Sequence, residues 1–119
     1  MANLNDSLND LMSLDGAMCA AVVDYNSGMM LASAGSGVDM ELAAAGNTEV
    51  VRAKMKTMKA LGLNDTIDDI LITLGKQYHI IRPSQRLSGI FVYYVLDNAR
   101  SNLALARRKV ADVEGKMTM

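Results

Sequence analysis

Three features of this sequence carry side chains that do chemistry in other proteins: a lone histidine, two adjacent aspartates and a lone cysteine. His79 would have to support any histidine metal site or Ser-His-Asp triad alone, and its apolar neighbours favour a structural role. Asp68 and Asp69 are neighbours in a strand-like segment, where successive side chains point to opposite faces and do not converge on one substrate atom. Cys19 lies in an apolar run with no cation nearby, which indicates a buried small residue. We therefore expect no catalytic site, metal or cofactor.

Two further segments resemble ligand-binding motifs but lack the partners those motifs need. Residues 34–37 contain two glycines, yet the lysine of a phosphate-binding P-loop does not follow them, so we expect a flexible link. Residues 106–109 include three consecutive basic residues, but no aromatic side chain nearby offers a base a stacking surface. The sequence therefore predicts no nucleic-acid partner and favours a binding module over an enzyme.

The composition predicts one domain over residues 1–119 that forms a core without disulfides. Half of the residues are hydrophobic, but only five are aromatic, so aliphatic side chains and ten methionines must fill the core. The longest apolar run, residues 90–96, is far too short to cross a bilayer, so we expect no membrane insertion. The first residues lack the basic and apolar regions of a secretory signal, so we expect a cytoplasmic location.

Charge is distributed unevenly along the chain, although the formal net charge is only −1. Every lysine and arginine lies at Arg52 or beyond it, and the charged residues before Arg52 are all aspartate or glutamate. Such a polarised chain can steer a charged partner. The alternative is internal neutralisation, in which an acidic first helix lies beside a basic last helix in weak surface ion pairs.

Hydrophobic periodicity and turn residues predict a sheet covered by helices. In the segment around residues 88–97 both the odd-numbered and the even-numbered positions are apolar. Since these point to opposite faces of a strand, the segment is predicted to be a central strand buried on both faces. A Gly-Lys turn at residues 75–76 defines a hairpin, and Pro83 ends its second strand. In chain order we expect a helix at 3–14, strands at 17–24 and 29–33, a long helix from 38 or 39 to 61, strands at 67–74, 78–82 and 88–97, and a helix carrying an apolar face at Ala99, Leu103, Ala106, Val110 and Val113.

The long helix carries an apolar stripe and a neighbouring basic row. The stripe contains Met40, Ala44, Val51, Met55 and Met58. The basic row contains Arg52, Lys56 and Lys59, preceded by Glu49. Such a row is usually a solvated face, and the alternative is a contact with a charged partner. Small residues at 43–46 would also let another helix approach closely.

The order of elements and three segments resemble the roadblock/dynein light chain family over nearly the whole chain. Gly75-Lys-Gln-Tyr-His-Ile-Ile-Arg-Pro83 is similar to the hairpin of bacterial members, and residues 91–107 are similar to their final strand and helix. Residues 11–24, followed by a turn at Gly28, are similar to their opening segment. The resemblance implies an α+β fold, a two-sided α/β/α sandwich. Its five-stranded antiparallel sheet carries one long helix on one face and the two terminal helices on the other.

The resemblance further implies a homodimer in which strand 67–74 pairs with its copy and the long helices pack together. An apolar edge strand would promote aggregation unless something pairs with it, and dimerisation removes that risk. We expect the dimer interface to contain Val51, Met55, Met58, Ile70, Leu71, Ile72 and Thr73. Packing the first and last helices on one face also brings Asp6 and Asp10 near Arg100 and Arg107.

The function implied by the resemblance is that of a non-catalytic homodimeric regulator or scaffold that binds a Ras-like small GTPase, with GTPase activation or co-activation among its options. No catalytic arginine carries over by motif, so any effect on hydrolysis would act by ordering the GTPase's own residues. We expect partner contact at Glu49, Arg52, Lys56 and Lys59. One alternative is a small-molecule sensing module with a cavity lined by Met18, Met55 or Met58. Another is a purely structural adaptor subunit.

Overall fold

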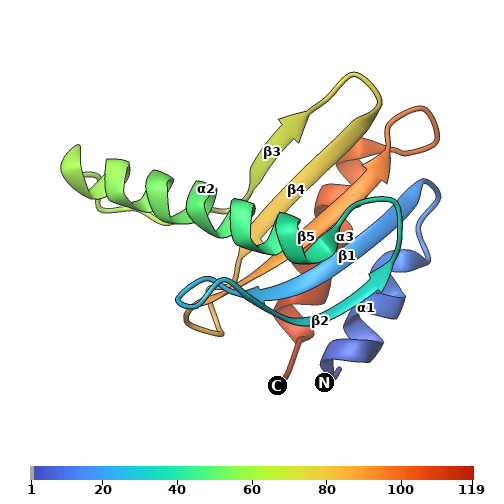
Figure 1. The fold of residues 1–119 in the computed structure, drawn as a ribbon, viewed down its shortest axis with the longest axis horizontal. Helices are drawn as coiled ribbons and strands as arrows, with labels where there is room; N and C mark the ends of the chain where they lie inside the picture. Colours follow the sequence, from blue (N-terminus) through green and yellow to red (C-terminus); the bar gives the residue numbers. More distant parts are fainter. Residues whose placement is uncertain (1) are drawn as a thin grey trace.

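The computed structural model describes residues 2–119, which form three helices around one sheet (Figure 1). In chain order the elements are α1 (Leu4–Met12), β1 (Ala17–Asp24), β2 (Met29–Gly35), α2 (Met40–Ala60), β3 (Ile70–Thr73), β4 (Gln77–Pro83), β5 (Ile90–Asp97) and α3 (Leu103–Lys116). Each helix begins at a residue whose side-chain oxygen accepts a backbone N–H of the first turn, namely Asn3, Asp39 and Asn102. The predicted number, type and order of the elements are confirmed within residues 2–119.

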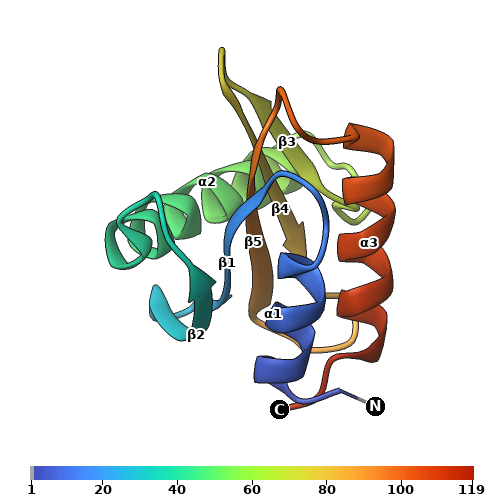
Figure 2. The same ribbon diagram turned by 90° about the vertical axis from the view of Figure 1, so that its right-hand side faces the viewer.

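The five strands form an antiparallel sheet in the order β2-β1-β5-β4-β3. Its centre is β5, in which residues 90–96 are all buried. This confirms the prediction made from apolar residues at both odd and even positions. Helices α1 and α3 cover one face, and α2 crosses the other (Figure 2). The predicted two-sided α/β/α arrangement is confirmed.

The face under α1 and α3 holds the larger core. Leu8 and Leu11 from α1 and Val110 from α3 pack with Val92 and Tyr94 of β5. The buried hydroxyl of Tyr94 donates a 2.6 Å hydrogen bond to the carbonyl of Leu11, which satisfies both polar groups. Burial raises the pKa of Tyr94, so this hydroxyl keeps its proton. The contact fixes α1 on the sheet.

The acidic first part of the chain and its basic later part partly neutralise each other. Lys109 on α3 lies 2.6 Å from the carboxylate of Asp10 on α1, so the two terminal helices do form an ion pair, but the cation is not the expected Arg100 or Arg107. Arg107 does not join this pair. Its guanidinium instead binds both carboxylate oxygens of Asp69, at 2.8 and 3.0 Å, because this side of α3 faces the segment that leads into β3.

Several boundaries differ from expectation. Strand β3 begins at Ile70 instead of residue 67, since its ladder with β4 starts there. Strand β2 continues through Gly35, which pairs with Cys19, so only the end of the predicted flexible link lies outside the sheet. Ala99 lies in an exposed turn before α3, and the apolar face of that helix therefore begins at Leu103. The other bounds shift by one or two residues, where chain ends leave or join the hydrogen-bonded pattern.

Candidate functional site

Helix α2 presents three different sides, because successive residues turn by about 100° around a helix. The side toward the sheet carries Ala44, Val51, Met55 and Met58. Val51 has 0% of its surface exposed and packs with Ile81 and Phe91, so it belongs to the core of its own chain. Contrary to expectation, it therefore has no surface to offer a second copy. Met55 and Met58 are half-buried, because this end of α2 runs beyond the sheet (Figure 1).

The outward side of α2 carries a stripe without charge that the sequence interpretation missed. Its members lie four, four, three, four and four residues apart, which keeps them within an arc of about 100°. We call them the outer stripe: Leu42, Gly46, Val50, Ala53, Thr57 and Leu61. All six are exposed, and Leu42 and Leu61 expose 70% and 66% of their surface. An uncharged stripe that carries three large exposed apolar side chains, Leu42, Val50 and Leu61, is a candidate surface for contact with a partner.

Strand β3 provides a second unpartnered surface. It pairs with β4 on one side, and no strand lies on its other side within residues 2–119. Ile70 and Ile72 pack toward the α2 face, Leu71 packs toward the opposite face, and Thr73 is exposed. No charged residue or proline lies between residues 70 and 73 to discourage pairing with another strand.

The charged flank of α2 consists of Glu49, Arg52, Lys56 and Lys59. All four side chains are exposed and lie within an arc of about 80°. The ion pairs found within residues 2–119 are Arg82 with Glu114, Arg107 with Asp69, and Lys109 with Asp10. The three cations of the flank take part in none of these. Their charge is therefore available to solvent or to a partner.

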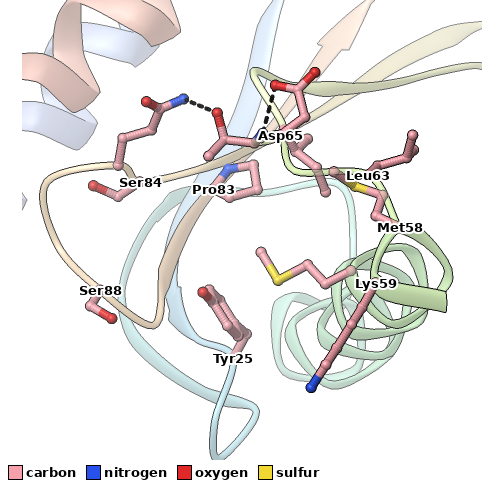
Figure 3. Close-up of a pocket in the computed structure, with 12 residues that line it drawn as sticks. Tyr25, Met58, Lys59, Leu63, Asp65, Pro83, Ser84 and Ser88 are labelled. Atoms are coloured by element: carbon pink, nitrogen blue, oxygen red, sulfur yellow. Dashed lines mark hydrogen bonds between the residues drawn. The ribbon is translucent and has the colours of Figure 1, made fainter. Parts of the chain in front are cut away.

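A cavity of about 500 Å³ opens beneath the C-terminal half of α2, and Lys59 of the charged flank lines it (Figure 3). Its walls come from α2, the loop before β3, the loop between β4 and β5, and the turn that holds Tyr25. The apolar part of the lining consists of Tyr25, Met55, Met58, Leu63, Ile67 and Pro83. Met18 does not line it. The cavity has the volume typical of small-ligand sites, which range from about 300 to 1,000 Å³.

A buried carboxylate fixes one wall of this cavity. Glu114 on α3 is 3% exposed, and it accepts hydrogen bonds from Arg82 Nε at 3.1 Å and from Ser84 Oγ at 3.0 Å. Arg82 also donates to the carbonyl of Asp68, and Ser84 Oγ accepts the backbone N–H of Leu87. The network ties α3 to both loops that border the cavity. Nothing in the sequence distinguishes Glu114 from a solvated acid, because its partners lie about thirty residues away.

The residues that attracted attention in the sequence are not brought together. The side-chain nitrogens of His79 contact Gln77 and Tyr93, and Asp69 pairs with Arg107. Cys19 is buried, and burial raises the pKa of its thiol. Within residues 2–119 no group of three or more histidine, cysteine, aspartate or glutamate side chains is arranged to hold a metal ion. Over the same residues, no helix has both the length and the apolar character required to span a membrane.

The sheet order and the placement of the helices define a roadblock-type α/β/α sandwich. No protein-family model matches the sequence, and no curated protein matches it. Solved structures do match. The Roadblock/LC7 domain from Streptomyces avermitilis superposes with a TM-score of 0.81 at 12% identity, covering 96% of this chain and 93% of that one. The resemblance expected from the sequence is therefore confirmed at the level of the fold.

Two further matches are MglB proteins. MglB from Myxococcus xanthus has a TM-score of 0.75 at 21% identity, covering 92% of this chain and 83% of that one. The gliding protein MglB from Thermus thermophilus has a TM-score of 0.69 at 15% identity, covering 94% of this chain and 88% of that one. The chain thus has the fold of a roadblock domain over almost its whole length.

Proposed function

We propose that residues 1–119 form a single roadblock-family domain that acts as a homodimeric, non-catalytic regulator or scaffold of a Ras-like small GTPase. The observation that carries the proposal is the pair of unpartnered surfaces formed by β3 and the outer stripe. The GTPase as partner rests on the roadblock resemblance and on the likeness to the bacterial MglB proteins.

We infer that the outer stripe and the free edge of β3 belong to one dimer interface. Figure 1 shows β3 on one side of α2, while the turn holding Tyr25 and the β4–β5 loop lie on the other. Lys59 lines the cavity on that second side, whereas Val50 and Leu61 lie roughly opposite Lys59 around the helix. The outer stripe is therefore tilted toward the β3 side. A second copy that pairs with β3 by a two-fold axis would bring its own α2 toward this stripe.

The proposed interface keeps Ile70, Leu71, Ile72 and Thr73 from β3. Its helical part moves from Met55 and Met58 to the outer stripe, because the two methionines face the cavity. A β carbon added at Gly46 would meet no atom within 4 Å in its own chain, so the surface there is flat and open. Glycine and alanine at such positions allow two helix backbones to approach closely. Dimerisation would pair the free edge of β3 and bury Leu42, Val50 and Leu61 together.

The charged flank is the proposed contact for the GTPase. Arg52, Lys56 and Lys59 have no ion-pair partner within residues 2–119, and an acidic patch on a partner would gain both attraction and faster association. Any stimulation of hydrolysis would act through ordering of the GTPase's own catalytic groups. The scaffold role requires only the contact.

Two measurements test the proposal. Sedimentation equilibrium at micromolar concentration is expected to give a dimer, and a strict monomer would overturn the homodimer. Affinity capture from the native lysate, with added GDP or a non-hydrolysable GTP analogue, is expected to recover a small GTPase. Capture of a multi-protein complex without a GTPase would instead favour the purely structural adaptor.

A further inference from the structure

We propose that the cavity beneath α2 is a docking groove for an acidic peptide segment of a partner protein, which inserts one large apolar side chain between Met55 and Met58. The proposal deepens the partner-binding role of the charged flank and rests on it. It assigns a pocket to the partner's apolar side chain and predicts acidic residues next to that side chain in the partner.

The apolar lining suits an inserted side chain. Met55 and Met58 line the cavity from α2, and Leu63 lies next to Met58, whose carbonyl accepts its backbone N–H at 3.0 Å. Ile67 and Pro83 add to the apolar lining from the two loops. Both methionines are only partly buried although they face the cavity, so an anchor would bury surface that the chain leaves open. Methionine adapts its shape to different apolar partners, which is why it is favoured at peptide-binding surfaces.

Charge at the rim selects an acidic occupant. Lys59 lines the cavity, and Arg52 and Lys56 continue the charged flank along α2 from it, without ion pairs in the described chain. The acid among the lining residues is Asp65, and its carboxylate accepts the backbone N–H of Thr66 at 2.8 Å. Figure 3 shows this carboxylate turned toward the loop and away from Tyr25. The cations at the groove are therefore not neutralised from within.

The shape favours a peptide over a compact ligand. From Arg52 to Lys59 the cationic edge extends about 10 Å along the helix, at about 1.5 Å per residue. An extended chain covers that distance in about three residues, so acids flanking one apolar residue would match the cations flanking the cavity. The hydroxyl of Tyr25 points toward the cavity (Figure 3), and Ser88 lines the same side, so both can bind a peptide backbone.

The groove is preformed and stays accessible in the proposed dimer. The hydrogen bonds of Glu114 to Arg82 and Ser84 hold the β4–β5 loop in place, so binding need not order this wall. The groove is walled by the turn that holds Tyr25 and by the β4–β5 loop. Both segments lie on the side of α2 that faces away from β3 (Figure 1). A dimer formed through β3 would therefore carry two open grooves.

The test uses the full chain labelled with ¹³C at its methionine methyl groups and two synthetic peptides of equal length. One peptide carries a central phenylalanine flanked by aspartate and glutamate, and the other carries lysine at each acidic position. The acidic peptide is expected to shift the methyl signals of Met55 and Met58, but not that of Met12 on the opposite face of the sheet. Its binding should weaken about tenfold or more in high salt, as expected for exposed charges.

Matched variants locate the site. Met58→Asp, which places a carboxylate in the groove, is expected to weaken binding of the acidic peptide at least tenfold. Leu105→Asp, which makes the same change at an exposed residue of α3, should leave it unchanged. Lys59→Glu should also weaken binding without disturbing the fold, as checked by circular dichroism.

Three results would overturn the groove. They are unmoved Met55 and Met58 signals, equal shifts from both peptides, and equal shifts from free N-acetylphenylalanine, which would indicate a small-molecule site. Failure of the proposed function is read separately, from sedimentation and GTPase capture. Binding of the acidic peptide by a protein that captures no GTPase would retain the groove and reject the GTPase.

Discussion

The Nδ1 atom of His79 lies 2.9 Å from the hydroxyl of Tyr93, and its Nε2 atom lies 2.8 Å from the side-chain oxygen of Gln77. A carboxamide oxygen only accepts hydrogen bonds, so Nε2 carries a proton. In the neutral imidazole Nδ1 then accepts a hydrogen bond from the tyrosine hydroxyl, so the neutral ring satisfies both contacts. Burial lowers the pKa of His79 below its usual 6.5, because a charged ring is poorly solvated there.

We therefore expect the free energy of unfolding to fall as the pH drops below about 6.5. The unfolded chain takes up the proton first, and the folded chain does so only at lower pH, so stability is present above the unfolded pKa and lost below it. Urea titrations across a pH series would measure the slope. His79→Gln should flatten this part of the profile, and an unchanged slope in the variant would show that another group is responsible.

Gly46→Glu is expected to separate dimerisation from folding. A β carbon at this position has no other part of the chain within 4 Å beyond the backbone of its own helix, and glycine is a poor helix former, so the monomer should remain at least as stable. A charge at the centre of the outer stripe should nevertheless weaken the dimer at least tenfold, measured by sedimentation equilibrium. Gly115→Glu on α3 is the matched control, since that exposed helical glycine is equally open. Dimerisation of both variants with the native affinity would remove the outer stripe from the interface.

Hydrogen exchange tests which edge of the sheet pairs with a second copy. We expect backbone amides of β3 to be protected at high protein concentration and to exchange faster on dilution, because dissociation exposes the free edge. Strand β2, the other edge, provides an internal reference whose exchange should not depend on concentration. Concentration-dependent protection of β2 instead of β3 would place the dimer at the opposite edge.

The double variant Arg52→Glu with Lys56→Glu is expected to lose partner binding but keep its stability. Neither residue forms an ion pair within residues 2–119, so the free energy of unfolding should change by no more than about 0.5 kcal/mol. Affinity for the captured GTPase, measured by calorimetry, should fall at least tenfold. Arg108→Glu with Lys116→Glu reverses two exposed cations of α3 and should bind normally. Equal losses in both variants would indicate a general charge effect.

Glu114→Gln is expected to lower the free energy of unfolding by about 1–3 kcal/mol, because it removes the charge that Arg82 and Ser84 bind. Urea denaturation would measure the change. Asp112→Asn on the same helix alters an exposed acid and should have little effect. Similar losses in the two variants would show that burial of Glu114 adds nothing specific.

The sequence was sufficient for the order of elements and the central place of β5. Apolar residues at both parities over 90–96 specify burial on both faces, and the Gly75-Lys76 turn specifies a hairpin, since both signals are local. Side chains of α2 were harder to assign. The helix carries apolar residues on two sides. The sequence alone therefore assigns Val51 to the dimer interface and does not single out the outer stripe, although the spacing of that stripe is visible in it.

By itself the sequence determined the spacing of apolar and polar residues, which shows which residues share a side of a helix or strand. Which side meets the chain's own sheet was decided only by tertiary packing, because that depends on where α2 crosses the strands and how far it runs beyond them. The same holds for Glu114 and Asp69, whose partners lie some thirty or more residues away in the chain. Their roles arise from contacts that form only when the helices pack on the sheet.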